Sequence, residues 1–252
     1  MKHKKNISKN ELYMVYGLNG CISILNSSLC SINEFIVSRS FTEQKQDLIS
    51  SIRKEKTIIT ILPDIEFNKK FHMHRAQGII VYFNYPLKDY LPPSEEKVDE
   101  CYLILDSIKD PQNLGQIIRT SECSGINGII FPERRSVGVT NAVLQVSQGA
   151  FCNLNLIRAK NIKYLINELK EDGFWIIGIE NSIEAKSWYE LDMKGKIAFV
   201  LGSEGEGIRP IIKKYCDFFG TIPMHGKSNS LNVSATASAI LFERNRQLAT
   251  KN

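Results

Sequence analysis

Apolar runs and amphipathic stretches alternate through the first third of the chain. The apolar runs have the length and the β-branched content of strands, and the stretches between them carry apolar side chains at helical spacing. The predicted elements are a helix over 20–29, a strand over 32–38, a helix over 42–55, and strands over 57–63 and 78–86. This alternation predicts a compact α/β unit.

The next segment, residues 87–100, breaks all periodicity. It contains the pair Pro92-Pro93 and five acidic residues, a composition that is typical of a linker. The sequence therefore predicts a first domain over residues 1–90, a linker over 91–100 and a second domain over 101–252.

Short apolar runs separated by helical stretches fill the second domain. These runs span residues 102–108, 128–132, 153–159, 174–180, 197–203 and 219–224. Short apolar strands that alternate with helices are typical of a parallel sheet covered on both faces. The predicted fold class is α/β for both domains.

Composition narrows the class of protein. A hydrophobic content of 43 % with 23 % charged residues fits a globular protein, and no apolar run reaches the roughly 18 residues that cross a bilayer. The N-terminus, MKHKKNISKN, has no apolar stretch behind it and lacks the pattern of a secretory signal, so a cytoplasmic location is expected. Six scattered cysteines form no CxxC pair, which favours reduced packing residues over a zinc site or disulfides.

The net charge of +5 is unevenly distributed. Residues 1–90 hold 13 Lys and Arg against 8 Asp and Glu, whereas residues 91–252 hold 19 of each. A basic first domain beside a neutral second one suggests that the first contacts a polyanion such as RNA and the second does chemistry. A merely solvated basic face would give the same count.

Residues 106–125 follow the first strand of the second domain, where open parallel sheets bind ligands. Asp110-Pro111 predicts a helix start and Gly125 a stop. On this helix Gly115 and Arg119 are four residues apart and share a face, so a guanidinium would emerge beside a residue without a side chain. From this segment alone, an ordinary solvent-exposed helix arginine is the favoured interpretation of Arg119.

The loop LGSEGEGI (201–208) follows another apolar strand. Its glycines at 202, 205 and 207 do not match the GxGxxG of a dinucleotide-binding turn. Glycines allow close approach of backbone to a ligand, while Glu204 and Glu206 disfavour phosphate, so an adenosine or a cationic ligand fits better. Taken as a lone motif, the loop is interpreted more readily as a simple tight connection between two elements.

A third segment, residues 222–243, ends in a predicted helix with Asn232 as its cap. Val233, Ala237 and further apolar residues recur at helical spacing, and the small residues of 234–239 make the early turns thin enough for tight packing or a subunit interface. Ser230 and Asn232 bring polar groups to the same strand ends.

In this order the three segments resemble the SpoU (TrmH-like) family of RNA ribose 2′-O-methyltransferases, within the SPOUT superfamily. The matching residues are Asn113, Gly115 and Arg119 in the first motif, Gly202, Glu204, Gly205 and Gly207 in the second, and Ile222 with Ser230 to Ser234 in the third. Residues 16–25 and 75–80 also resemble the ribosomal-protein L30e-like RNA-binding domain of the subgroup that methylates large-subunit (23S-type) ribosomal RNA.

The resemblance implies a trefoil-knotted catalytic domain that binds S-adenosyl-L-methionine, acts as a homodimer and needs no metal. It implies 2′-O-methylation of a ribose, expected to be a guanosine in 23S-type ribosomal RNA. The implied cofactor-binding residues are Gly202, Gly207, Ile222, Met224, Leu231 and Val233. The implied catalytic residues are Asn113, Arg119, Glu204, Ser230 and Asn232. Arg119 matches the arginine proposed to remove the hydroxyl proton, but holding a phosphate and stabilising the alkoxide suits a guanidinium equally well.

Three alternatives stay open from the sequence. A tRNA ribose methyltransferase would share all three motifs, and a non-catalytic RNA-binding or ribosome-assembly factor could keep the fold. A Rossmann-type methyltransferase or oxidoreductase is disfavoured by the missing GxGxxG. A weaker hypothesis is that His72 and His74 are metal ligands. Another is that four aromatic residues stack on RNA bases, although core packing is favoured for most of these four: Phe41, Tyr82, Phe83 and Tyr85.

Overall fold

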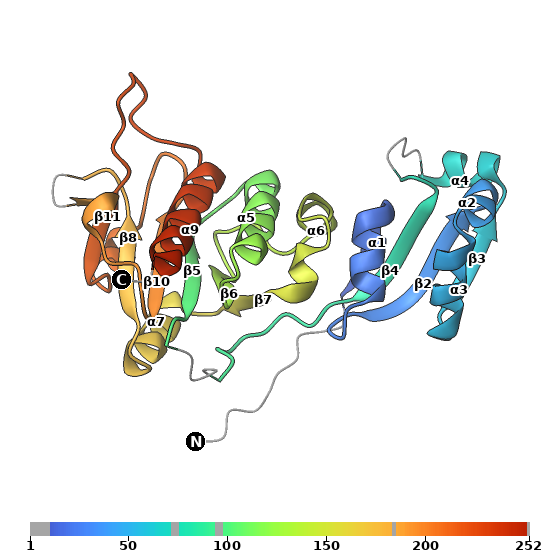
Figure 1. The fold of residues 1–252 in the computed structure, drawn as a ribbon, viewed down its shortest axis with the longest axis horizontal. Helices are drawn as coiled ribbons and strands as arrows, with labels where there is room; N and C mark the ends of the chain where they lie inside the picture. The colour runs from blue at the N-terminus through green and yellow to red at the C-terminus, as the bar shows by residue number, and fades with distance from the viewer. Residues whose placement is uncertain (1–10, 72–75, 94–97, 183–184, 251–252) are drawn as a thin grey trace.

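The computed structural model describes residues 11–71, 76–93, 98–182 and 185–250. They form two β-sheets at opposite ends of an elongated molecule (Figure 1). The N-terminal sheet has four strands in the order β1-β4-β2-β3. Its strands are β1 (Leu12–Tyr16), β2 (Ser31–Ser38), β3 (Ile58–Leu62) and β4 (Ile79–Asn84).

Strand β4 lies inside the small sheet, and its side chains alternate between two hydrophobic clusters. Ile79, Val81 and Phe83 join the main core with three helices, whereas Ile80 and Tyr82 pack with the fourth helix on the other face. The helices are α1 (Leu18–Leu25), α2 (Arg39–Gln44), α3 (Gln46–Lys54) and α4 (Asp64–Phe71). The predicted α/β unit is therefore a sheet with helices on both faces.

The second sheet has seven strands in the order β7-β6-β5-β10-β8-β11-β9, and every pairing is parallel. All residues of β5 and β6 are buried, as expected of strands covered on both faces. The strands are β5 (Cys101–Asp106), β6 (Gly128–Pro132), β7 (Asn155–Ala159), β8 (Trp175–Ile179), β9 (Lys186–Ser187), β10 (Ile197–Gly202) and β11 (Phe218–Thr221).

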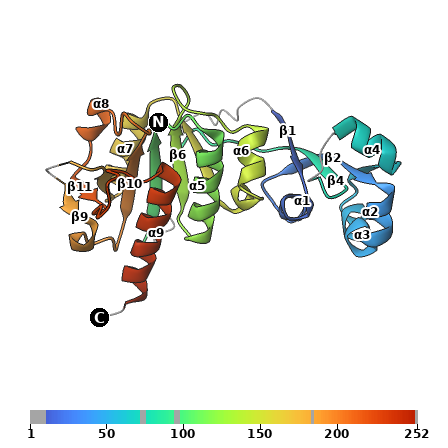
Figure 2. The same ribbon diagram turned by 90° about the horizontal axis from the view of Figure 1, so that it is seen from above.

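Helices cover both faces of this sheet, with α5, α6 and α9 on one side and α7 and α8 on the other (Figure 2). The α-helices are α5 (Pro111–Cys123), α6 (Asn141–Val146), α7 (Ile162–Glu171), α8 (Pro210–Lys213) and α9 (Val233–Ala249). Two short 3-10 helices are η1 (Ala150–Asn153) and η2 (Trp188–Glu190). The predicted parallel α/β architecture is confirmed.

A continuous hydrophobic cluster joins the two sheets. Phe83 at the end of β4 stacks on Phe151 of η1 with ring centroids 5.6 Å apart, and Tyr85 meets the same ring edge-on. The Gln145 side chain on α6 accepts a hydrogen bond from the Tyr16 backbone N–H and donates one to the Tyr16 carbonyl. The N-terminal unit is therefore packed against α6 and η1 instead of being joined only by a linker.

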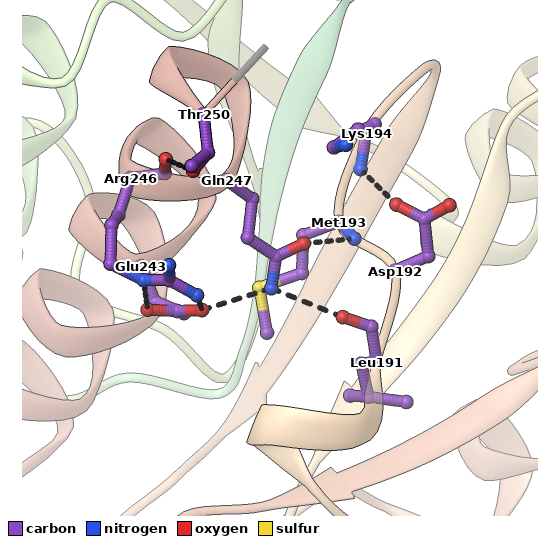
Figure 3. Close-up of polar contacts among 8 residues, drawn as sticks. All are labelled: Leu191, Asp192, Met193, Lys194, Glu243, Arg246, Gln247 and Thr250. Carbon is purple, nitrogen blue, oxygen red and sulfur yellow. Dashed lines mark hydrogen bonds and ion pairs between the residues drawn. The ribbon is translucent and has the colours of Figure 1, made fainter. Parts of the chain in front are cut away.

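The C-terminal helix α9 is held at its far end by a polar network around Gln247 (Figure 3). The Gln247 amide donates to the Leu191 carbonyl at 3.1 Å and accepts from the Met193 N–H at 2.9 Å. It also donates to Glu243, which forms two hydrogen bonds with Arg246 one turn away. These contacts fix α9 to the segment that leads into β10.

Five of the six cysteines are buried or half-buried, as packing residues are, whereas Cys123 is exposed. All six are free thiols, and burial raises the pKa of Cys101 to about 12. Cys30 and Cys152 approach each other across the contact between the two units, with sulfur atoms 3.8 Å apart. The hydrogen bond between them lowers the pKa of Cys30.

Several local predictions need correction. The first strand and α4 were not predicted, because β1 is only five residues long and α4 is mostly polar. The predicted helix over 42–55 is two helices that meet at Lys45, and α1 begins at Leu18 and ends at Leu25. Core packing is confirmed for Phe41, Phe83 and Tyr85, which are buried.

His72 and His74 lie outside the described residues. In the part of the chain that the structure describes, no helix combines the length and the apolar character needed to cross a membrane.

Candidate active site

The candidate site lies at the carboxyl edge of the seven-stranded sheet. From β5 the chain builds β6 and β7 on one side, and it later places β10, β8 and β11 on the other side. Open parallel sheets bind ligands at the carboxyl ends of strands where the strand order reverses in this way. Gly202, the last residue of β10, pairs in register with Asp106, the last residue of β5. The first two candidate segments therefore start from adjacent strand ends.

Residues 203–207 form a tight turn over the end of β10. The Ser203 N–H donates to the Gly207 carbonyl at 3.2 Å, and the Gly207 N–H donates to the Ser203 carbonyl at 3.0 Å. A Cβ atom on Gly202 would lie 2.0 Å from the Gly207 carbonyl carbon, so only glycine allows the turn to fold back this closely. The segment is the tight connection that one interpretation predicted, and it also lines a cavity.

A buried ion pair fixes the end of this turn. Asp106 is fully buried, and its carboxylate accepts hydrogen bonds from the Arg209 backbone N–H at 2.9 Å and from Arg209 Nε at 2.7 Å. Arg209 Nη2 lies 2.6 Å from the same carboxylate. A charge that has lost all contact with water needs such a partner. The sequence analysis missed this pair: an aspartate within an apolar strand signals a buried carboxylate, but it does not identify Arg209 as the partner.

Asn232 caps α9, as predicted, and this role orients its amide. Its Oδ1 accepts hydrogen bonds from the Ser234 backbone N–H at 2.8 Å and from the Ser234 hydroxyl at 2.6 Å. Because the oxygen is used by the cap, the amide nitrogen must point the other way. It donates to Glu204 Oε1 at 2.9 Å and to Asn113 Oδ1 at 3.0 Å.

Asn113 completes a three-residue network with Glu204 and Asn232. Its amide nitrogen donates to Glu204 Oε1 at 2.8 Å, and the residue is only 7 % exposed because it lies on the first turn of α5. The structure thus brings together residues separated by 91 and 119 positions in sequence. Within the described residues Glu204 Oε2 has no hydrogen-bond partner, so the network presents a carboxylate oxygen that can accept a bond from a ligand.

A cavity of about 380 Å³ opens beside this network, between the loops that follow β8, β10 and β11. A volume of this size is typical of a small-molecule site. The lining contains every residue predicted to bind the cofactor, together with Glu204 and Ser230: Gly202, Gly207, Ile222, Met224, Leu231 and Val233. Leu231 is 43 % exposed, which leaves apolar surface available for a ligand.

The lining also includes residues that the sequence analysis missed. Asn181 and Glu180 follow β8, and Thr221 ends β11. The Asn181 amide donates to the Asn229 carbonyl at 3.0 Å and ties the loop after β8 to the loop after β11. No motif distinguished these residues, because their contribution depends on the strand order.

A smaller cavity of about 160 Å³ adjoins the other side of the network. Its lining shares Ser203, Glu204 and Val233 with the larger cavity and adds Lys109, Asp110 and Asn113 from the start of α5. The Asp110 side chain caps this helix by accepting from the Gln112 N–H, as predicted. The polar network therefore lies between two hollows, one beside β8 and β11 and one beside α5.

Arg119 does not line either cavity. It is exposed, and it lies six residues beyond Asn113 on α5, a rise of about 9 Å along the helix. The sequence suggested an open gap at Gly115 beside Arg119, but the structure has no such gap. A Cβ atom there would lie 2.5 Å from Val146 Cβ, so Gly115 allows α6 to approach α5 closely. Of the predicted catalytic residues, only Arg119 is separate from the site in the described chain.

Across residues 11–71, 76–93, 98–182 and 185–250, no three His, Cys, Asp or Glu side chains come close enough to hold a metal ion.

The chain matches a known family over most of its second domain. Residues 100–242 fit the model of the SpoU rRNA Methylase family. A protein assigned to the TrmH family of tRNA/rRNA methyltransferases in Staphylococcus aureus (strain MSSA476) is 34 % identical over 217 residues, covering 84 % of this chain and 87 % of that protein. YacO of Bacillus subtilis (strain 168), which carries the same family assignment, is 32 % identical over 233 residues, covering 91 % of this chain and 93 % of YacO.

Solved structures share the fold over almost the whole chain. An S-adenosylmethionine-bound rRNA methyltransferase from Sinorhizobium meliloti superposes with a TM-score of 0.80 at 21 % identity, covering 94 % of this chain and 88 % of that chain. The SpoU methyltransferase AviRb from Streptomyces viridochromogenes, also in complex with S-adenosylmethionine, gives a TM-score of 0.81 at 19 % identity, with coverage of 95 % and 92 %. These similarities include the N-terminal unit.

Proposed function

Because this chain belongs to the SpoU rRNA methylase family of RNA methyltransferases, we propose that it methylates the 2′-hydroxyl of a guanosine ribose in 23S-type ribosomal RNA, using S-adenosyl-L-methionine. The observation that carries the proposal is the Asn113–Glu204–Asn232 network at the wall of a cavity. Such a network positions polar groups beside a bound small molecule.

The cavity fits S-adenosylmethionine in size and in chemistry. Gly202 and Gly207 leave backbone exposed at one wall, while Ile222, Met224 and Leu231 offer apolar surface for an adenine ring. Glu204 makes the surroundings favourable to a cation, whereas the Glu180 carboxylate at the same wall is paired with Lys213 at 2.6 Å. When bound, the cofactor supplies a methyl group on a positively charged sulfur, with a neutral thioether as leaving group. Two neighbours of the same fold were solved with this cofactor.

The target hydroxyl is a weak nucleophile, so the protein has to orient it and stabilise the charge that forms as its proton leaves. Glu204 Oε2 can accept a hydrogen bond from the ribose, and Asn113 and Asn232 hold that carboxylate in place. Ser230, at the cavity wall, can donate to the substrate. Arg119 would assist proton removal, or it would bind the adjacent phosphate and stabilise the alkoxide.

A homodimer would explain the position of Arg119. The residue is exposed and separate from the cavity of its own chain, so it can contribute to the site of a partner subunit. The neighbouring helix α9 supports such an interface with a row of small residues over 234–239 and a half-exposed Phe242. Family membership further supports a trefoil knot in the catalytic domain, a ribosomal-protein-like RNA-binding role for the N-terminal domain and a cytoplasmic location.

The test is to incubate the purified protein and labelled S-adenosylmethionine with unmodified large-subunit ribosomal RNA and, separately, with tRNA. Any alkali-resistant 2′-O-methyl nucleotide is then mapped. The expected result is label at one guanosine in ribosomal RNA. Label only in tRNA would keep the chemistry and change the substrate, whereas no label in either RNA would favour a non-catalytic RNA-binding factor.

A further inference from the structure

Four exposed basic residues lie on the half of the carboxyl edge that the cofactor cavity does not use. They are Lys109 after β5, Arg134 and Arg135 after β6, and Lys160 after β7. Strands β5, β6 and β7 are adjacent and parallel, so the residues that follow them emerge along one edge of the sheet. Sequence separations of up to 51 positions hide this arrangement, and the chain's charge count over residues 91–252 gives no sign of it.

Backbone contacts make the four residues one continuous surface. The Val137 N–H and the Ser136 hydroxyl both donate to the Ile108 carbonyl, at 2.7 and 2.8 Å, and this fixes the loop after β6 beside Lys109. On the other side, the Glu133 N–H donates to the Ala159 carbonyl at 2.9 Å, directly before Lys160. The surface therefore runs from the end of β7, across the loop after β6, to the start of α5.

The basic groups on this surface are available to a ligand. Within the described part of the chain, none of the four forms an ion pair or a side-chain hydrogen bond. Acidic residues also lie on or beside the surface: Asp110, whose carboxylate accepts the capping bond from Gln112, the exposed Glu133, and Asp89, which follows the Lys88 carbonyl bonded to Arg158 N–H. Positive charge exceeds negative charge there, and isolated exposed cations of this kind are what binds a phosphate backbone.

One end of this surface meets the polar network. Lys109 lines the 160 Å³ cavity together with Asn113 and Glu204, so a strand lying on the surface would reach the network from the side opposite the 380 Å³ cavity. We propose that Lys109, Arg134, Arg135 and Lys160 bind the phosphate backbone of the substrate RNA next to the target nucleotide and lead its ribose to the network. This inference rests on the proposed function for the identity of the site, but the surface can be tested without methyl transfer.

The experiment compares the wild type with the double variant R134Q/R135Q, using the full-length protein and a short single-stranded RNA of mixed sequence. The matched control is K194Q/K214Q, which removes two exposed lysines that precede β10 and β11 at the opposite edge of the sheet. Binding is measured by fluorescence anisotropy between about 0.05 and 0.2 M salt, because phosphate contacts appear as a slope against salt concentration.

We expect R134Q/R135Q to weaken RNA binding about tenfold and to make the salt slope shallower by about 0.7 for each phosphate contact that is lost. Binding of S-adenosylmethionine should not change. With an RNA that the wild type methylates as substrate, the KM for that RNA should rise with little change in kcat, since phosphate contacts position the strand. Lys109 and Lys160 are then tested singly as K109Q and K160Q, with smaller losses of the same kind.

An unchanged salt slope in R134Q/R135Q would overturn the proposal, as would an equal loss in K194Q/K214Q. Absence of RNA binding by the wild type would overturn it as well. If the wild type binds RNA and R134Q/R135Q loses that binding, but no RNA becomes methylated, the surface assignment is supported while the proposed function fails. The two conclusions therefore remain distinguishable.

Discussion

The two halves of the carboxyl edge of the seven-stranded sheet differ in charge and in shape. Over β10, β8 and β11 the loops surround a cavity and carry Glu204 and Glu206, while Arg209 and Lys213 are used in ion pairs with Asp106 and Glu180. Over β5, β6 and β7 the loops carry exposed basic residues that form no ion pair within the described part of the chain. The Asn113–Glu204–Asn232 network lies where the halves meet.

This difference shows how one sheet edge can serve two ligands of opposite charge. The half with acidic loops suits a cationic cofactor, and the half with exposed basic residues suits a polyanion, so the two ligands can approach the same point without competing for the same groups. Over residues 91–252 as a whole, the 19 basic and 19 acidic residues cancel. The distribution of charge along the sheet edge, and not the net charge, distinguishes the two halves.

Arg119 belongs to neither half, and its replacement should have the largest effect. We expect Arg119→Ala to lower the rate of methyl transfer by about 10³-fold or more, as loss of a group that stabilises developing charge does. Binding of S-adenosylmethionine should stay near normal by calorimetry, because Arg119 does not line the cavity. The matched control is Gln116→Ala, an exposed residue one turn earlier on α5. Transfer at the wild-type rate by Arg119→Ala would remove the residue from the mechanism.

A dimer is the expected state if Arg119 acts in a partner's site. Sedimentation of the active protein should therefore give twice the mass of the 28.6 kDa chain. A mixture of Arg119→Ala with a variant defective in the cavity, such as Gly202→Ala, should regain part of the activity, because some mixed dimers would hold one intact site. A fully active monomer would contradict the shared site.

Glu204 and Glu206 provide a comparison within the acidic half. Glu204→Ala should lower kcat/KM by about 10²-fold, since Asn113 would lose its acceptor and a buried amide without a partner costs about 1–3 kcal/mol. Glu206 is exposed and does not line the larger cavity, so Glu206→Ala should stay within about threefold of the wild type. Equal losses of kcat/KM in both variants would show that activity depends on the negative charge of this loop and not on the Asn113–Glu204–Asn232 network.

Glycine substitutions compare the shapes of the two halves. Gly202→Ala places a Cβ atom against the returning backbone of Gly207, so we expect cofactor affinity to fall about tenfold and stability to fall by about 1–3 kcal/mol. Gly138→Ala, in the loop after β6, meets no atom within 4 Å and should change neither property. Calorimetry with S-adenosylmethionine and thermal unfolding measure both effects, and normal cofactor binding by Gly202→Ala would show that the turn can relax.

The smallest effect should come from removing residues 1–10. They contain four lysines and no acidic residue, whereas residues 11–71 and 76–90 together hold eight basic and eight acidic residues. The basic excess of the first domain is thus not spread over its described part. We expect this deletion to make the salt slope of RNA binding shallower by less than the change in R134Q/R135Q. A larger change would make the N-terminus the main RNA contact.

Deletion of all of residues 1–90 is a poorer test of the same idea. It would remove Phe83 and Tyr85 from the aromatic cluster around Phe151 and expose part of the shared core. A loss of RNA binding could then reflect unfolding, which circular dichroism would have to exclude.

Local chemistry in the sequence predicted much of the candidate site. Asp110 and Asn232 were predicted as helix caps and are caps, because a side-chain oxygen next to free N–H groups needs little beyond its neighbours in the chain. The buried strands β5 and β6 were predicted from their continuous apolar runs, which are also a local feature of the sequence. The RNA methyltransferase family was predicted from three motifs and is confirmed.

What depended on distant parts of the chain could not be predicted from pattern. The Asp106–Arg209 ion pair, the contribution of Asn181 to the cavity and the proximity of Lys109 to the loop after β6 all follow from strand order and register. A residue's periodicity reports which face it occupies, but it carries no information on which strand lies beside it.

The sequence by itself determined the family, the α/β class and the residue types available for chemistry, since these follow from local spacing and composition. Only the tertiary structure decided that Asn113, Glu204 and Asn232 share hydrogen bonds, that Arg119 is separate from them, and that basic side chains gather on one half of the sheet edge. The physical reason is that a parallel sheet aligns the carboxyl ends of strands that are far apart in sequence. Electrostatic and hydrogen-bonding partners are set by that alignment, and not by distance along the chain.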